Sequence, residues 1–289
     1  MASTNSGAKS LTVSDLSNWE FSFTFESYGV KVRIDSNSDR ILAKTKAIAK
    51  KSFLGHLEFI DNTTVDNDYR FGLKIFGGDL FEFYENGSLR GESKGEVAVL
   101  GFFTSYLRAI VAERAKPWVF IHAGVVARNG RAILIPGDSY SGKTTLVADL
   151  IRQGAEYYSD EYAVLDGQGL VHPFPRDLSI RIRGDRLEVE ETPPGELGGK
   201  VGANRVKVGL VVATRFTPQA VWKPERLTIG NGIKELIAHT ISIRFNTEFG
   251  LKVLNTALEH AIILKGERGD STEVAKTLLS FMDDNLNWS

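Results

Sequence analysis

No segment of this chain limits the choice of fold as strongly as "RAILIPGDSYSGKTTLVADLIRQG", residues 131–154. Its centre fits the pattern G-x-x-x-x-G-K-[ST] with Gly137, Asp138, Ser139, Tyr140, Ser141, Gly142, Lys143 and Thr144. Glycines let backbone N–H groups curl around phosphate oxygens, and the helix that follows directs the positive end of its dipole at the anion. The segment therefore predicts a strand, a phosphate-binding loop and a helix in succession.

The residues on both sides of this loop supply the context that the pattern needs. Ala132–Ile135 is typical of a buried strand, and Thr144–Arg152 is typical of a helix. In such a loop Lys143 reaches the β- and γ-phosphates, and the hydroxyl of Thr144 ligates Mg²⁺. We expect Thr145, in the first helical turn, to contact the nucleotide as well. The sequence thus predicts a nucleotide site that also holds Mg²⁺.

A histidine is expected close to the loop if the preceding strand pairs as its turn indicates. Asn129-Gly130 is a strong signal for a two-residue hairpin turn. Counting outward from this turn pairs residue 128 with 131 and, further along, His122 with Gly137. From there an imidazole reaches the phosphates or the group that attacks them. The alternative is a histidine that local hydrogen bonds hold at a strand end.

An acidic pair, Asp160-Glu161, begins 17 residues after Lys143. A helix and a short strand, Glu156–Ser159, fill the interval, so the pair is expected at the end of that strand. Ligands of open α/β sheets bind at the carboxyl ends of strands. Asp160 and Glu161 are therefore candidates for contacting Mg²⁺ or a substrate hydroxyl. The alternative is an aspartate in a surface turn.

Composition excludes several classes of function. The 289 residues carry 35 Lys and Arg against 36 Asp and Glu, so no basic field gathers nucleic acid. No apolar run of about 18 residues could span a membrane, and the first ten residues lack the apolar core of a signal peptide. Without cysteine, disulfides, thiolate nucleophiles and cysteine-ligated zinc are excluded. We expect a cytoplasmic protein with no nucleic-acid or membrane partner, and a homo-oligomer stays open.

The chain before the loop predicts a separate domain. Residues 1–12 are polar and predict a tail, and residues 13–115 predict a small antiparallel β-rich domain with a connecting helix. Residues 19–34 and 69–92 alternate apolar and polar side chains, as half-buried strands do. Residues 95–115 place apolar side chains on one helical face. We expect this domain to recognise the acceptor or a partner.

Residues 116–289 predict an α/β domain, a mixed sheet with flanking helices, built around the loop. Residues 191–204 are rich in proline and glycine and predict a long loop, and residues 206–216 predict a buried strand. Helices are expected at residues 232–246, 250–264 and 270–285.

The histidine, the loop and the acidic pair together resemble the catalytic core of the HPr kinase/phosphorylase family. That family joins a strand beginning with histidine, a hairpin, a G-D-S-x-x-G-K-[ST] loop and an acidic Asp-Asp pair, whose second position is Glu161 here. The intervals between His122, the loop and Asp160-Glu161 match this arrangement, and the resemblance is specific over residues 118–165. Tyr140 stands where the family loop usually has a third glycine. The resemblance implies a P-loop, HPr-kinase-like fold for the second domain, with ATP and Mg²⁺ as cofactors.

The resemblance also implies a reaction, transfer of the γ-phosphoryl group of ATP to a serine hydroxyl. It implies Asp160 as the general base and His122 as its neighbour. Lys143 and Thr144 would hold the phosphates and Mg²⁺, and Glu161 would make a second metal or substrate contact. General chemistry agrees, because a carboxylate positioned to take a hydroxyl proton contributes roughly 10²–10⁴-fold.

The acceptor stays open among a peptide, a protein and a small molecule with a hydroxyl group. Related cores resemble peptide-tailoring kinases, including those that act on lasso-peptide precursors, and phosphoenolpyruvate carboxykinases. Two further functions therefore remain as alternatives, a nucleotide-binding module without phosphotransfer and a phosphorylase- or carboxykinase-like enzyme.

Four arginines, Arg176, Arg181, Arg183 and Arg186, cluster after the acidic pair and are candidates for contacting an acidic acceptor or the transferring phosphoryl group. Arg181 and Arg183 share one face of an expected strand, and a guanidinium fork suits carboxylate or phosphate. Arg205 follows the glycine-rich residues 198–202, which are a candidate lid. The alternatives are a solvated strand edge for the arginines and a plain connector for the glycines.

Overall fold

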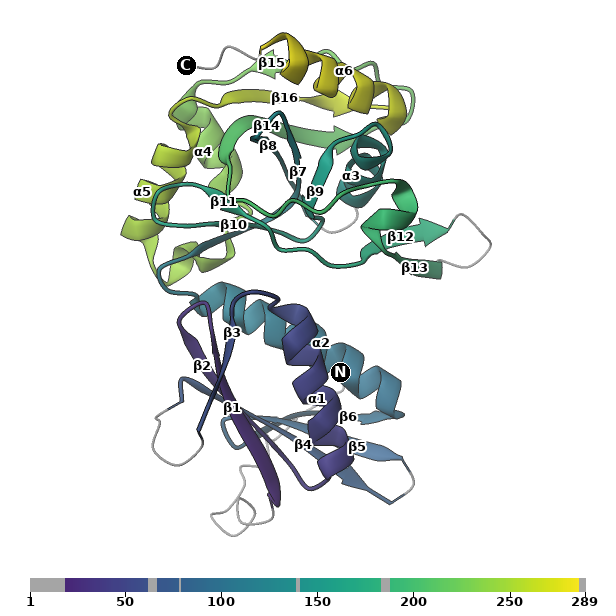
Figure 1. The fold of residues 1–289 in the computed structure, drawn as a ribbon, viewed down its shortest axis with the longest axis vertical. Coiled ribbons are helices and arrows are strands. Elements are labelled where there is room, and N and C mark those ends of the chain that lie inside the picture. Colours follow the sequence, from purple (N-terminus) through teal and green to yellow (C-terminus); the bar gives the residue numbers. More distant parts are fainter. Residues whose placement is uncertain (1–18, 62–66, 78, 139–140, 183–187, 286–289) are drawn as a thin grey trace, which may run out of the picture. The chain divides into compact units, whose positions relative to one another are not determined.

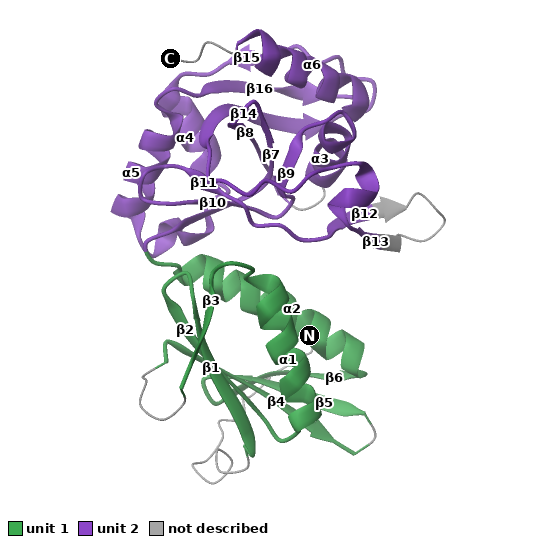
Figure 2. Cartoon of the chain, viewed as in Figure 1, with its two compact units in different colours: residues 1–116 green, residues 117–289 purple. Residues whose placement is uncertain are grey.

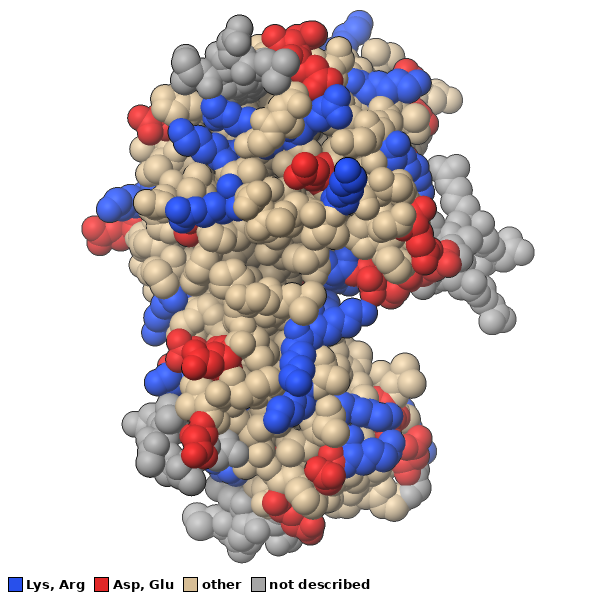
Figure 3. All heavy atoms as spheres, viewed as in Figure 1, with Lys and Arg blue, Asp and Glu red and all other residues tan. Residues whose placement is uncertain are grey.

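The computed structural model describes residues 19–61, 67–77, 79–138, 141–182 and 188–285, with the backbone alone at residues 181–182 and 188–189 (Figure 1). The chain divides between Lys116 and Pro117 into two compact units, each with strands and helices (Figure 2). The protein is therefore a mixed α/β chain. Within the described ranges, no helix combines the length and the apolar character needed to cross a membrane. Acidic and basic side chains are interspersed on the face drawn in Figure 3.

Unit 1 contains one six-stranded sheet, in the order β3-β1-β2-β4-β5-β6. Its elements are β1 (Phe21–Ser27), β2 (Val30–Ser36), α1 (Asp39–Ser52), β3 (Leu57–Ile60), β4 (Tyr69–Phe76), β5 (Leu80–Glu85), β6 (Ser88–Lys94) and α2 (Glu96–Arg114). The expected antiparallel arrangement is wrong for one pair, because β2 and β4 are parallel. Helix α1 and strand β3 lie between β2 and β4 in the sequence. They bring the chain back to the end of the sheet where β2 begins, so β4 runs in the same direction as β2.

Unit 2 contains the main sheet, in the order β11-β10-β7-β8-β14-β16-β15, with β9 paired to β7. Its elements are β7 (Val119–Arg128), β8 (Arg131–Pro136), α3 (Lys143–Arg152), β9 (Glu156–Ser159), β10 (Tyr162–Leu165), β11 (Val171–His172), β12 (Leu178–Ile182), β13 (Glu188–Thr192), η2 (Pro194–Leu197), β14 (Lys207–Phe216), β15 (Glu225–Arg226), α4 (Ile229–Ile237), η3 (Ile241–Arg244), α5 (Thr247–Leu258), β16 (Ile262–Arg268) and α6 (Ser271–Asp284). Strands β12 and β13 form a small sheet of their own.

The main sheet is mixed and has helices on both faces. Strand β14 is parallel to β8 and to β16, whereas β7 pairs antiparallel with β8, β9 and β10. Side chains of α3 and α6 bury one face of the sheet, and side chains of α4 and α5 bury the other. The carboxyl ends of β8, β14 and β16 therefore lie at the same edge, as Figure 1 shows.

The expected helix at residues 250–264 is wrong at its end. Helix α5 stops at Leu258, and Ile262–Arg268 forms strand β16 beside β14. A short apolar run such as Ile262-Ile263-Leu264 fits a buried strand as well as a helix. The parallel position next to β14 decides between them, because pairing there satisfies the backbone groups of both strands.

The hairpin of β7 and β8 has the predicted register. Arg128 faces Arg131, and Ala123 faces Pro136. Asn129 and Gly130 have φ values of 53° and 70°, as a two-residue turn with both central residues at positive φ requires. The hairpin therefore carries residue 122 to the first glycine of the loop.

Candidate functional site

The loop between β8 and α3 needs glycine at two described positions. Gly142 has a φ of +85°, and a Cβ there would lie 2.5 Å from Nη2 of Arg268. A Cβ on Gly137 would lie 2.8 Å from the hydroxyl oxygen of Ser141. Arg268 is buried and donates a hydrogen bond of 2.7 Å from Nη2 to the carbonyl of Gly142. The two predicted loop residues Ser139 and Tyr140 lie outside the described residues.

Lys143 is buried in the first turn of α3 and points back into the loop. Its Nζ donates hydrogen bonds of 2.6 Å to the carbonyls of Gly137 and Asp138. Burial lowers the pKa of Lys143 to about 8, against the opposing charges of Asp138 and Asp160. The structure thus holds an ammonium group over the first residues of the loop, next to the N-terminus of a helix.

The next residue, Thr144, contacts the acidic pair. Its hydroxyl donates to Oδ2 of Asp160 at 3.3 Å, and the hydroxyl of Tyr157 donates to Oδ1 of Asp160 at 3.1 Å. Asp160 reaches this place because Ser159 shapes the turn between β9 and β10: its hydroxyl oxygen accepts from the N–H of Glu161 at 3.1 Å. Burial raises the pKa of Asp160, although the positive charge of Arg176 opposes this. A raised pKa makes a carboxylate a stronger base.

Arg176, one of the four arginines that cluster after the acidic pair in the sequence, contacts that pair directly. It donates from Nη1 to Oε2 of Glu161 at 2.5 Å and from Nη2 to the hydroxyl of Ser179 at 3.0 Å. Its Nε lies 3.8 Å from Oδ1 of Asp160. Burial alone would lower the pKa of Arg176, but Glu161 and Asp160 more than reverse this and raise it. One guanidinium therefore balances both carboxylates, whereas the sequence had indicated a contact with the acceptor or the phosphoryl group.

The structure brings His122 to the loop, as the register indicated. The carbonyl of His122 accepts from the N–H of Gly137 at 3.3 Å. Burial, with a smaller contribution from the nearby charge of Lys143, lowers the pKa of His122 to about 4. Glu161 acts in the opposite direction, so these groups lie within electrostatic range of one another. His122 is a neutral imidazole at neutral pH and offers one donor and one acceptor nitrogen.

A second histidine stands on the other flank of the loop. His239 follows α4, and its carbonyl accepts from the N–H of His122 at 2.8 Å. Its Nδ1 lies 3.3 Å from Oδ1 of Asp138. Sequence reasoning missed this neighbour, because no spacing relates the end of α4 to the loop.

The predicted metal ligands fit Mg²⁺ only in part. Mg²⁺ prefers oxygen and is usually held by one or two carboxylates together with substrate phosphates. The oxygens of Thr144 and Asp160 fit this pattern, whereas Glu161 is already engaged by Arg176. The described part of the chain contains no cluster of three or more His, Asp and Glu side chains that could hold a metal without the phosphates.

Of the remaining predicted acceptor contacts, Arg205 does not reach the acidic pair. Arg205 donates to Oδ2 of Asp166 at 3.3 Å, and Asp166 directly follows β10 at the end away from Glu161. Arg181 lies in the small sheet of β12 and β13, with only its backbone described, and Arg183 lies outside the described residues. Thr145 is exposed in the first turn of α3, where it remains a predicted contact.

The candidate lid is fixed to the sheet. Tyr157 donates its N–H to the carbonyl of Lys200 at 2.8 Å, and Gly202 donates to the carbonyl of Tyr157 at 2.9 Å. Val201 forms a bridge with Tyr157, and a Cβ on Gly202 would strike the ring of Tyr158. These contacts hold residues 200–202 against β9 through an isolated β-bridge, which argues against a hinged lid.

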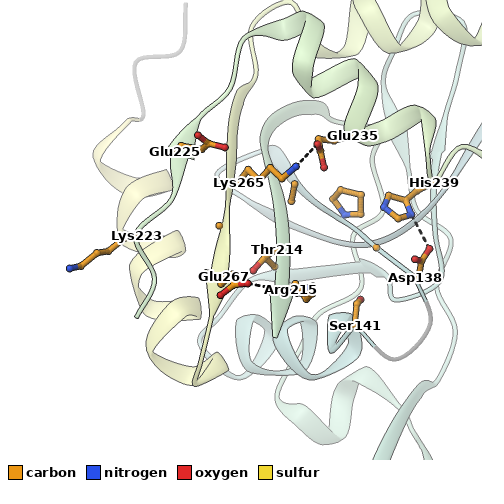
Figure 4. Close-up of a pocket in the computed structure, with 14 residues that line it drawn as sticks. Asp138, Ser141, Thr214, Arg215, Lys223, Glu225, Glu235, His239, Lys265 and Glu267 are labelled. Atoms are coloured by element: carbon orange, nitrogen blue, oxygen red, sulfur yellow. Dashed lines mark hydrogen bonds and ion pairs between the residues drawn. The ribbon is translucent and has the colours of Figure 1, made fainter. Parts of the chain in front are cut away.

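A cavity of about 660 Å³ adjoins the loop at the carboxyl ends of β8, β14 and β16 (Figure 4). We call it the strand-end cavity. It is lined by Pro136, Gly137, Asp138, Ser141, Ala213, Thr214, Arg215, Lys223, Glu225, Glu235, His239, Lys265, Gly266 and Glu267. None of the acidic pair, Thr144 or Arg176 is among these residues, so the acidic pair does not line the cavity.

Comparisons with known proteins give little beyond this geometry. No protein-family model matches the chain, and no curated protein matches it. Among solved structures, the HPr(Ser) kinase/phosphatase from Coxiella burnetii is similar at 15% sequence identity, over 57% of this chain and 94% of that one, with a TM-score of 0.30. A TM-score this low carries no argument about function, so the site must be interpreted from its own chemistry.

Proposed function

We propose that this protein is an ATP-dependent kinase that transfers the γ-phosphoryl group to a hydroxyl, with serine in a peptide or protein as the first candidate and a small molecule as the second. One observation carries the proposal. The hydroxyl of Thr144 lies 3.3 Å from the carboxylate of Asp160, beside a loop whose Lys143 is buried. A phosphate cradle, an ammonium group and a carboxylate thus meet at one place.

The proposed reaction uses each of these groups. Backbone N–H groups of the loop and the ammonium of Lys143 bind the β- and γ-phosphates. Asp160 takes the proton of the acceptor hydroxyl while the acceptor oxygen forms a bond to the γ-phosphorus, and the bond to the bridging oxygen breaks to release ADP. When bound, Mg²⁺ supplies charge neutralisation on the phosphates.

The surroundings of Asp160 suit a base. Burial raises its pKa, which strengthens it as a proton acceptor. Arg176 works against that rise and keeps an ionised form accessible next to Glu161. His122 is neutral, so it acts through hydrogen bonds and not through charge.

Transfer of label from γ-labelled ATP with Mg²⁺ tests the proposal. The acceptors are a degenerate serine peptide library and free serine, and the variants are Asp160→Asn and Lys143→Ala. Asp166→Asn is a matched control, because it makes the same substitution at the other end of β10. We expect wild type and control to label an acceptor and the Asp160 variant to be slower by roughly 10²-fold or more.

The same assay separates the alternatives. ATP binding that requires Lys143, without transfer to any acceptor, would support a nucleotide-binding module. Activity that depends on inorganic phosphate or pyrophosphate would support a phosphorylase-like enzyme. Transfer by Asp160→Asn at the wild-type rate would remove this carboxylate from the mechanism.

A further inference from the structure

The strand-end cavity lies where α/β sheets ordinarily bind ligands. Helix α3 leaves β8 toward one face of the sheet, and α4 leaves β14 toward the other, because their apolar residues belong to different cores. The gap between the carboxyl ends of two such strands is a topological switch point, the usual ligand crevice of an open sheet. Its volume of about 660 Å³ is within the range of small-molecule sites.

Three side chains that line this cavity have a buried polar atom without a hydrogen-bond partner among the described residues. They are Ser141, Thr214 and His239, through Oγ, Oγ1 and Nδ1. His239 has a charge contact with Asp138 but no aligned hydrogen bond to it. Buried polar groups in folded proteins are nearly always paired, so three such atoms around one cavity indicate a missing polar ligand.

The charges that line the cavity do not suit a phosphate. Arg215 pairs with Glu267 at 2.7 Å, and Lys265 pairs with Glu235 at 2.6 Å (Figure 4). The full lining has three basic side chains against four acidic ones: Arg215, Lys223 and Lys265 against Asp138, Glu225, Glu235 and Glu267. A polyanion is repelled here, whereas a neutral group with hydroxyls and amines finds carboxylates to accept its hydrogen bonds.

The geometry of phosphoryl transfer indicates which neutral group binds in the strand-end cavity. The attacking and leaving oxygens lie roughly in line, on opposite sides of the transferred phosphorus. In the order of the sheet, β7 and β10 lie on one side of β8, with the acidic pair, whereas β14 and β16 lie on the other, with the cavity. If Asp160 receives the acceptor proton, the leaving diphosphate extends toward β14.

We propose that the strand-end cavity holds the nucleoside of the nucleotide, and that the acceptor approaches from the side of Asp160 and Arg176. This inference rests on the proposed kinase function and adds to it the orientation of the nucleotide. It makes Ala213 and Thr214 determinants of nucleoside binding that take no part in holding the phosphates.

Binding of two probes tests the orientation, ATP with Mg²⁺ and inorganic tripolyphosphate with Mg²⁺, which has the phosphates without the nucleoside. The variants are Thr214→Val, which removes the hydroxyl at constant shape, and Ala213→Leu, which fills the cavity. Thr256→Val, an exposed position on α5, is the matched control for the threonine change. We expect ATP affinity to fall about 2- to 10-fold in the valine variant and about 10-fold or more in the leucine variant. Tripolyphosphate affinity stays unchanged in both.

Each outcome has a distinct meaning. Unchanged ATP affinity in both variants overturns the proposal, and a raised KM for the acceptor in those variants would assign the cavity to the acceptor instead. An equal loss of ATP and tripolyphosphate also overturns it, since the change would then act through the loop. A wild-type protein that binds neither probe would overturn the kinase function itself. If the wild type binds both probes, Lys143→Ala should weaken both, which shows that the loop holds the phosphates.

Discussion

The buried ammonium group of Lys143 predicts that nucleotide affinity falls as the pH rises through 8. Burial lowers the pKa of Lys143 to about 8 from its ordinary value of 10.5. With this pKa, about nine tenths of the molecules carry the charge at pH 7 and about one tenth at pH 9. Only the charged form attracts the phosphates fully, so we expect the Kd for ATP to rise roughly tenfold over this interval, about 1.4 kcal/mol.

Titration calorimetry at constant ionic strength, in steps from pH 7 to pH 9.5, measures this slope. Lys143→Arg is the matched control, because a guanidinium keeps its charge throughout the interval. The arginine variant should therefore lack this slope, and any pH dependence that remains in it measures the contribution of the nucleotide itself. A wild-type profile as flat as that of the variant would refute the reasoning. It would mean that the amine is not the group that loses its proton, or that it does not contact the phosphates.

Three further results are expected from the same site. Gly142→Ala places a Cβ at a residue with positive φ and against the buried guanidinium of Arg268, so ATP affinity should fall at least about tenfold. Gly195→Ala is the control: it has open space around it and should bind ATP normally in the same titration. Arg176→Met leaves the acidic pair without its cation, so chemical denaturation should show a loss of about 3 kcal/mol at pH 7. The loss should shrink at lower pH, where Asp160, whose pKa burial raises, takes up a proton; an equal loss at pH 7 and pH 5 would contradict this. His122 has a folded pKa of about 4 against an ordinary 6.5, so the unfolded chain binds more protons between these values and wild type should lose about 1 kcal/mol of stability from pH 7 to pH 5, after allowance for solvent screening. His122→Gln should lack this loss in paired denaturation curves, and a variant as acid-sensitive as wild type would rule the histidine out as its cause.

Local signals in the sequence predicted the elements closest to the loop. Asn129-Gly130 defines its turn by backbone preference alone, and the turn then sets the register that brings His122 to the loop. Strand β9 was expected at its observed bounds, because its apolar run is short and ends at turn residues. In these segments, neighbours along the chain decide the structure.

Contacts between distant segments were beyond such reasoning. Arg176 reaches the acidic pair only because of the path that the chain takes after β11, and no spacing encodes that path. Strand β16 was missed because its apolar run is too short to reveal a period. His239 meets Asp138 through the packing of α4 on the sheet. The roles assigned to His122 and Asp160 stay predictions that the experiments above address.

The tight turn at Asn129-Gly130 has a practical consequence for anyone who engineers this protein. Both residues are exposed and stand roughly 20 Å along β7 from His122, so they look like a permissive place for an epitope tag. Yet a strand that slips by one residue turns every side chain to its opposite face. An insertion that shifted the register of β7 against β8 by one residue would turn the imidazole of His122 to the opposite face without changing a single residue of the site.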